Sequence, residues 1–177
     1  MRLQGVALAL VGSLCVMAQA ARADTQVFKR AGVWEAFGGT TNNGRLVCGV
    51  SSHGTGKYFG LKYFAGQRTL TIQLGSSDWR IKNGSNQQVM MQIDGDAPWQ
   101  AIGIGMHFSD GDAGLEFTIR RKQVDKFMAE FRDGNQMVVR FPGADVSDWR
   151  ANLDGSDVVS DSFLACLRAM GSAGETE

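Results

Sequence analysis

The chain has 177 residues, 18 basic and 18 acidic side chains, and a mean hydropathy of −0.14. This length suffices for one domain with a substantial hydrophobic core. The balanced charge argues against nucleic acid as a partner, because phosphate binding needs a basic surface that releases counterions. The dense basic run Arg120–Lys122 is expected to be a solvated face at the start of a helix.

The first 23 residues have the pattern of an export signal. Arg2 gives a positive start, residues 6–18 are mostly apolar, and Ala21-Arg22-Ala23 has the small-x-small spacing that signal peptidase reads. The apolar run is too short to span a bilayer, which takes about 20 residues. An uncleaved anchor and lipoprotein processing at Cys15 are the alternatives.

Cleavage after Ala23 defines three expected parts: a cleaved signal peptide (1–23), a single domain (24–170) and a flexible, small and polar tail (171–177). The signal carries two basic residues and no acidic one, so the mature chain would have 16 basic and 18 acidic residues, a net charge of −2. We expect a periplasmic or secreted protein with no membrane insertion after cleavage.

Two cysteines, Cys48 and Cys166, remain after cleavage. An even pair in an exported protein is expected to form a disulfide. A redox-active pair is the alternative, but such pairs usually have C-x-x-C spacing. The bond would join an early strand to the last helix.

Short apolar runs separated by Gly, Asn and Asp pairs predict a mostly antiparallel β protein. The predicted strands, in chain order, are Val33–Phe37, Arg45–Ser51, Lys57–Phe64, Thr69–Leu74, Gln88–Ile93, Trp99–Phe108, Leu115–Ile119, Met137–Phe141 and Trp149–Leu153. Gly103 and Gly105 fall inside one of these strands and predict a bulge or a close backbone approach.

Two stretches change to a helical period. Val124, Phe127, Met128 and Phe131 recur at i, i+3, i+4 and i+7, and Gly134 is placed to end that helix. The same spacing recurs near the C-terminus at Phe163, Cys166, Leu167 and Met170, in a helix that Ser156 is expected to cap.

The expected architecture is mainly β: an antiparallel β-sandwich or flattened barrel of seven to nine strands with two helices. One helix crosses over between strands and the other closes the fold.

Catalytic and metal motifs are absent from the sequence. His107, Ser109 and Asp110 could suggest a triad, but neighbours on one strand point to opposite faces. The Asp94-Gly95-Asp96 and Asp110-Gly111-Asp112 turns are better explained by hairpins than by calcium, because they lack the full loop pattern. We expect no cofactor and no metal.

The aromatic residues are the best lead to a binding site, although most large aromatic residues of a β-sandwich fill its core. The strand Lys57–Phe64 carries aromatic residues on both faces, so one of these faces would lie outside the main core and could meet a helix, a partner or a sugar-like ligand. The candidate ligand-binding residues are Tyr58, Tyr63, Trp79 and Trp99.

Three segments of the chain resemble a known family. They are the Trp-containing strand Val33–Phe37, the cysteine strand Leu46-Val47-Cys48 and the segment Leu153–Ser156 before the last helix. They are similar to the invasion-associated locus B family of Gram-negative envelope proteins, over most of residues 33–170. The resemblance implies a non-enzymatic periplasmic or surface β-sandwich, associated in some bacteria with entry into host cells, and it supplies no catalytic residues.

Three functions follow as expectations. The first is an exported envelope protein that is not an enzyme and acts by binding a protein, a surface component or a glycan. The second is a carbohydrate-binding module or an enzyme inhibitor that uses the aromatic residues. The third is a carboxylate-based hydrolase in which Glu35 or Glu116 acts with an aspartate.

Overall fold

The computed structural model describes residues 23–54, 56–144 and 146–173, so most of the predicted signal peptide lies outside the described residues. Within the described part, the chain forms ten strands and two helices. The strands are β1 (Asp24–Ala31), β2 (Trp34–Thr40), β3 (Leu46–Gly54), β4 (Lys57–Phe64), β5 (Thr69–Ser76), β6 (Asn86–Ile93), β7 (Trp99–His107), β8 (Ala113–Arg120), β9 (Gln136–Arg140) and β10 (Trp149–Asn152), and the helices are α1 (Arg121–Asp133) and α2 (Ser156–Ala173).

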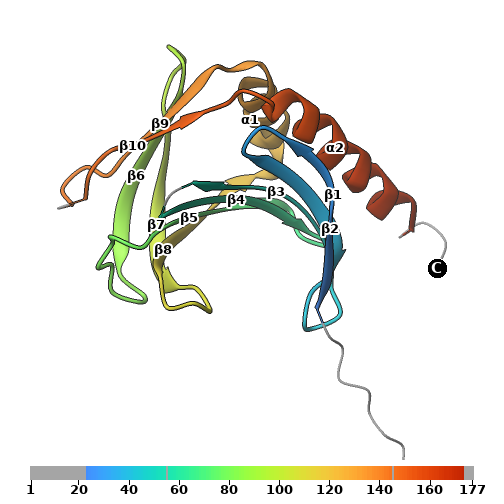
Figure 1. Ribbon diagram of the computed structural model, residues 1–177, viewed down its shortest axis with the longest axis horizontal. Coiled ribbons are helices and arrows are strands. Elements are labelled where there is room, and N and C mark those ends of the chain that lie inside the picture. The colour runs from blue at the N-terminus through green and yellow to red at the C-terminus, as the bar shows by residue number, and fades with distance from the viewer. Residues whose placement is uncertain (1–22, 55, 145, 174–177) are drawn as a thin grey trace, which may run out of the picture.

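All ten strands belong to one antiparallel sheet with the order β1-β2-β3-β4-β5-β8-β7-β6-β9-β10. Figure 1 shows the strong curvature of this sheet, whose end strands β1 and β10 are not paired with each other. The expected mainly-β class is confirmed, with α1 as the crossover helix between β8 and β9 and α2 as the C-terminal helix.

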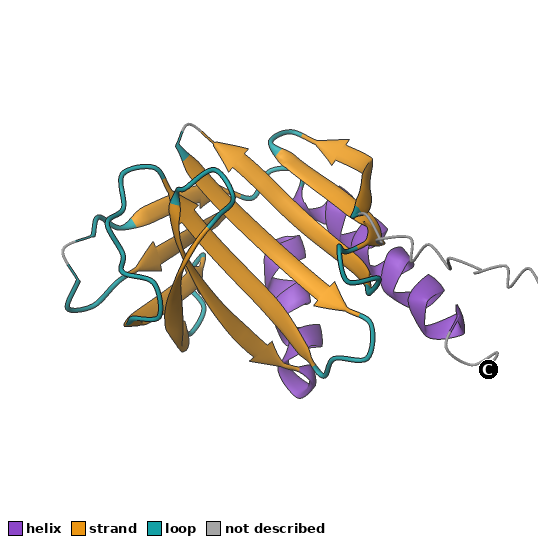
Figure 2. Ribbon diagram, turned by 90° about the horizontal axis from the view of Figure 1, so that it is seen from below, coloured by secondary structure: helices purple, strands orange, loops and turns teal. Residues whose placement is uncertain are grey.

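The two helices cover one face of the sheet. Helix α1 contacts β5 and β8, and α2 contacts β1, β2 and β3. Figure 2 shows the opposite side, with the strands in front and both helices behind them. The face that points away from the helices, here called the uncovered face, carries every second side chain of the central strands.

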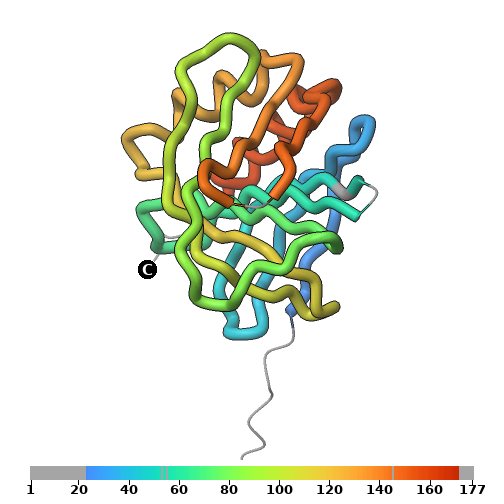
Figure 3. Tube along the Cα trace, turned by 90° about the vertical axis from the view of Figure 1, so that its left-hand side faces the viewer, coloured from blue at the N-terminus to red at the C-terminus, as the bar shows by residue number. Residues whose placement is uncertain are grey.

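The core lies between the helices and the curved sheet. Trp34 on β2, Phe59 on β4 and Phe131 on α1 are fully buried, and their ring centroids lie 5.0–5.8 Å apart. Strand β9 returns to pair with β6 (Figure 3). This pairing brings the ring centroid of Trp149 on β10 to 6.2 Å from that of Phe59. At this corner the Trp34 indole donates to the carbonyl of Asn152 at 3.1 Å, so the two halves of the sheet approach without closing.

Helix α1 follows its predicted pattern. Phe127, Met128 and Phe131 are buried, and the helix ends just before Gly134, whose N–H donates to the Glu130 carbonyl at 2.9 Å. Gly134 has an extended φ of −78°, so it is required for space rather than for conformation. A Cβ there would come within 2.4 Å of an Ile93 methyl group.

The expected cap at Ser156 is wrong. Ser156 is the first residue of α2, and its buried hydroxyl donates to the Phe131 carbonyl at 2.7 Å. The last turn of α1 leaves carbonyls without helical partners, and Ser156 satisfies one of them. This bond ties the end of α1 to the start of α2.

The predicted disulfide is present between Cys48 on β3 and Cys166 on α2, with a Cα–Cα distance of 6.0 Å. Gly38 lets the bond lie close to the sheet, because a Cβ there would meet Cys166 Sγ at 2.9 Å and the Phe28 ring at 3.1 Å. The bond therefore fixes α2 across the N-terminal half of the sheet.

Sequence reasoning missed β1. Its side chains are exposed except for a half-buried Ala31, so no alternation marks it as a strand, and pairing with β2 is what extends it. Helix α2 runs to Ala173 and so includes the first residues of the expected tail. No helix of residues 23–173, as far as they are described, has the length and apolar character needed to cross a membrane.

Candidate functional site

The four predicted ligand-binding residues lie in four different places. Tyr58 is on the uncovered face of β4, and Tyr63 is on the helix side of the same strand. Trp79 follows β5, and Trp99 begins β7 beside α1. The structure therefore does not gather them into one aromatic site.

Tyr63 belongs to a hollow of about 310 Å³ beneath the helices, between the β4–β5 turn and the ends of α1 and α2. Its hydroxyl donates to the Gln67 carbonyl at 2.9 Å and lies 3.4 Å from the Arg121 guanidinium. These bonds give Tyr63 a role in holding the β4–β5 turn.

Trp79 borders a hollow of about 620 Å³ between the β5–β6 connection and the β9–β10 connection. The ring packs edge-to-face against Phe141 with a centroid distance of 5.1 Å. Trp79 is half-buried and contacts the core from this edge.

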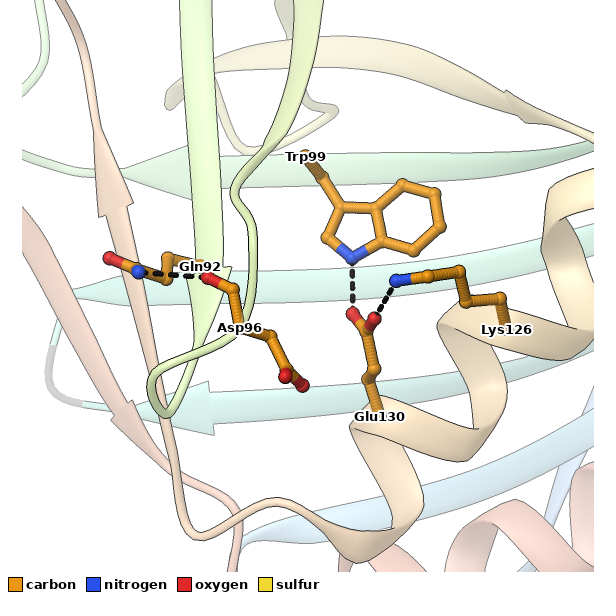
Figure 4. Close-up of polar contacts among 5 residues, drawn as sticks. All are labelled: Gln92, Asp96, Trp99, Lys126 and Glu130. Atoms are coloured by element: carbon orange, nitrogen blue, oxygen red, sulfur yellow. Dashed lines mark hydrogen bonds and ion pairs between the residues drawn. The ribbon is translucent and has the colours of Figure 1, made fainter.

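Trp99 is held by α1, as Figure 4 shows. Its indole N–H donates to the Glu130 carboxylate, and the same carboxylate forms an ion pair with Lys126. The Lys126 ammonium lies 5.0 Å from the centroid of the Trp99 ring. Gln92 donates to the Asp96 carbonyl at 2.9 Å in the adjacent β6–β7 turn. These contacts make Trp99 a link between sheet and helix.

The uncovered face is where polar and aromatic groups do converge. Tyr58 lies against Gly60 on this face, where a Cβ would approach the tyrosine hydroxyl to 2.2 Å. Phe108 lies over Gly75 and Gly114 in the same way, with a closest Cβ approach of 2.5 Å at each. The two rings meet edge-to-face at 5.2 Å and form an aromatic wall.

A chain of hydrogen bonds crosses the centre of this face. The Lys62 ammonium donates to Gln73 Oε1 at 2.7 Å, and Gln73 Nε2 donates to Glu116 Oε2 at 2.7 Å. These side chains come from β4, β5 and β8, which are neighbours in the sheet. We call them the Lys62–Gln73–Glu116 chain.

The Lys62–Gln73–Glu116 chain is partly shielded from solvent although no helix covers it. Gln73 is 9% exposed, and the neighbouring Thr71 and Ser51 are 6% and 5% exposed. Burial lowers the pKa of Lys62, and the nearby Glu116 carboxylate opposes that shift. Burial also raises the pKa of Tyr58 to about 12. Both shifts come from the same loss of hydration.

Two hollows lie on this face, one toward each end of the strands. The first, of about 380 Å³, has Tyr58, Lys62 and Phe108 in its wall. The second, of about 470 Å³, is lined by Thr71 and Glu116 together with the β2–β3 turn. The Lys62–Gln73–Glu116 chain lies between them, so the three features form one continuous candidate site.

The Asp-Gly-Asp segments are turns. The Asp94 carboxylate accepts backbone N–H bonds from Asn135 and Gln136, which lower its pKa. Asp110 Oδ1 accepts from the Asp112 N–H at 3.1 Å. Among the described residues, no three His, Cys, Asp or Glu side chains gather closely enough to hold a metal ion.

Sequence reasoning missed Lys62, Gln73 and Phe108 as site residues. Glu116 was named, but as a candidate catalytic carboxylate. The available signal was one glycine in each of β4, β5 and β8, namely Gly60, Gly75 and Gly114, which leave room for aromatic rings to lie over the sheet. The pairing of β5 with β8 brings Gln73 to Glu116, and a crossover of that kind leaves no local trace in the sequence.

Comparison with known proteins bears on the fold. No family model matches the chain, and no curated protein matches it. The crystal structure of invasion associated protein B from Bartonella henselae matches with a TM-score of 0.56 and 12% sequence identity, over 79% of this chain and 97% of that chain. The resemblance inferred from the sequence is therefore supported at the level of the fold, which this chain shares with that invasion associated protein.

Proposed function

We propose that this protein is an exported, non-catalytic envelope protein that acts by binding an envelope or surface component on its uncovered face. The signal-like N-terminus and the Cys48–Cys166 disulfide support a periplasmic or secreted location. The fold shared with an invasion associated protein is compatible with this role.

The observation that carries the proposal is the Lys62–Gln73–Glu116 chain, in which Gln73 is buried and both charged residues are half-buried. Partial removal of an ammonium and a carboxylate from water costs free energy, and the Gln73 amide bridges the two groups. A titratable side chain whose pKa is shifted by burial, located in a surface hollow, marks a candidate functional site. The helices lie on the other face of the sheet, so a ligand in solvent can reach the Lys62–Gln73–Glu116 chain.

The carboxylates of the hydrolase alternative have other partners. Glu35 on β2 forms an ion pair at 2.7 Å with Arg30 on the edge strand β1. Glu116 accepts the amide of Gln73 from the adjacent strand β5, and it lies on β8, four strands from Glu35 on β2. The hydrolase alternative pairs Glu35 or Glu116 with an aspartate, and the partners of these two carboxylates are Arg30 and Gln73 instead.

The test is capture from the cell envelope. Mature, disulfide-bonded protein is immobilised as wild type, Lys62→Met and Lys29→Met, and bound material is identified by mass spectrometry of both protein and sugar. Lys29 is an exposed lysine on β1 and serves as the matched control.

We expect one component that wild type and Lys29→Met retain and Lys62→Met loses at least tenfold. Equal recovery by all three proteins, or recovery by none, would contradict binding at this face. Circular dichroism of each variant establishes that the fold is retained before the comparison is made.

A further inference from the structure

We infer that the uncovered face binds an uncharged saccharide chain that lies along β4, β5 and β8 across the Lys62–Gln73–Glu116 chain. The inference rests on the proposed function and names the ligand class for the same site. Four observations carry it: the aromatic wall, the polar chain, the balance of charge and the length of the site.

The aromatic wall suits the apolar faces of sugar rings. Tyr58 and Phe108 lie along the sheet because Gly60, Gly75 and Gly114 leave room for them. Both rings are half-buried and line the first hollow, so each still presents surface to a ligand. A sugar has apolar ring faces and polar hydroxyl groups, so it matches a wall made of two aromatic rings and the Tyr58 hydroxyl.

The polar chain suits hydroxyl groups. Lys62 is a pure donor with three N–H groups, and its bond to Gln73 uses one of them. Glu116 is an acceptor whose Oε2 receives the Gln73 amide. A hydroxyl both donates and accepts, so adjacent hydroxyls of a sugar can bond to the ammonium at one end and the carboxylate at the other.

Charge selects an uncharged chain. In the first hollow Lys57 and Lys62 are balanced by Asp110 and Asp112. In the second hollow Arg45 is balanced by Glu116. An anionic or cationic polymer would meet a group of its own sign in either hollow, and that juxtaposition costs affinity.

The site is extended rather than compact. Tyr58 and Phe64 bracket the two hollows along β4, and the six residue steps between them span about 20 Å of strand. This length fits several sugar rings in a row. A polypeptide that adds a strand would instead need a free sheet edge, and β4, β5 and β8 are all internal strands.

The experiment is calorimetric titration of the mature, disulfide-bonded protein with tetramers of β-1,4-linked N-acetylglucosamine and of β-1,4-linked glucose. A tetramer of galacturonic acid serves as the anionic comparison. We expect saturable binding of at least one uncharged tetramer, weakened at least tenfold by Phe108→Ala and by Lys62→Met and unchanged by Lys29→Met. Binding of the galacturonate tetramer should be at least tenfold weaker than that of the uncharged one.

A measurement on the wild type keeps the test independent of variant folding. The side-chain amide resonances of Gln73 should shift on addition of the uncharged tetramer. The inference is overturned by absence of saturable binding, by binding that leaves Gln73 unchanged, or by a preference for the anionic tetramer. If these titrations fail while envelope capture still yields a Lys62-dependent protein, the saccharide inference falls and the proposed function stands. If neither saccharide binding nor Lys62-dependent capture is observed, the saccharide inference and the proposed function are both overturned.

Discussion

Single glycines decide how the aromatic residues of the uncovered face are arranged. A strand residue normally carries a side chain that stands away from the sheet, and that side chain would displace any ring lying over it. Gly114 shows this most clearly, because an added Cβ would come within 2.5 Å of Phe108 and 2.8 Å of the Leu74 carbonyl. The second contact is to backbone, which cannot move aside as a ring can.

Gly114→Ala is therefore expected to lower the free energy of unfolding by about 1–3 kcal/mol, the usual cost of overpacking. Urea denaturation followed by circular dichroism measures it. Gly95→Ala is the matched control, because no atom lies within 4 Å of a Cβ at that position. Equal stability of the two variants would mean that Phe108 does not lie over Gly114.

Tyr58 provides a spectroscopic report of burial on the same face. The chain has two tyrosines, so an ultraviolet titration can assign each ionisation by comparison with Tyr58→Phe. We expect Tyr58→Phe to remove the transition with a pKa of about 12. The folded state holds this proton up to about pH 12, whereas the unfolded state releases it near pH 10.0. The free energy of unfolding that Tyr58 contributes is therefore lost as the pH rises from about 10 to about 12. Ionisation of Tyr58 near pH 10 would refute its burial.

At the level of elements, the sequence predicted those helices and strands whose pattern depends on residues close together in the chain. The i, i+3, i+4 spacing located α1, and a short aromatic-rich run bounded by turn residues located β4 at its observed ends. Gly105 also behaved as expected for a close approach, because a Cβ there would lie 2.2 Å from the Lys82 carbonyl. Strand β1 was missed because its exposed side chains show no alternation.

The link between β7 and α1 is an element-scale contact that sequence reasoning treated as a ligand site. Trp99→Phe keeps the ring beside Phe127 but removes the N–H that Glu130 accepts. We expect a loss of about 1.5–3 kcal/mol in the free energy of unfolding, as for a hydrogen bond to a charged group. Lys122→Met, an exposed change on the same helix, should stay within about 0.5 kcal/mol of wild type. An unchanged stability for Trp99→Phe would argue against this link.

At the level of the whole molecule, the order of the strands could not be read from the sequence. Strands β5 and β8 pair across two intervening strands, and β9 returns to β6 after α1. The candidate site depends on the first of these pairings, since Gln73 and Glu116 meet only there. Polar residues on separate strands look like ordinary solvated positions until that topology is known. The disulfide, by contrast, followed from counting cysteines.

The disulfide joins residues 118 positions apart, so it should contribute strongly to stability. The chain-entropy model gives about 4.7 kcal/mol for a loop of about 100 residues. Cys48→Ser combined with Cys166→Ser should lower the free energy of unfolding by a similar amount in urea. Wild type reduced with dithiothreitol should match the double variant, and a difference below about 1 kcal/mol from oxidised wild type would contradict this account.

The same bond also sets an order of events. Cys48 and Cys166 lie near opposite ends of the described chain. A ribosome makes the chain from its N-terminus, so Cys48 must stay reduced, or form only temporary bonds, while strands β4 to β10 are synthesised. Cys166 arrives with α2, after every strand of the sheet has been made. The bond can therefore form only after all ten strands have been synthesised, and a chain truncated before α2 would keep the Cys48 thiol without its partner.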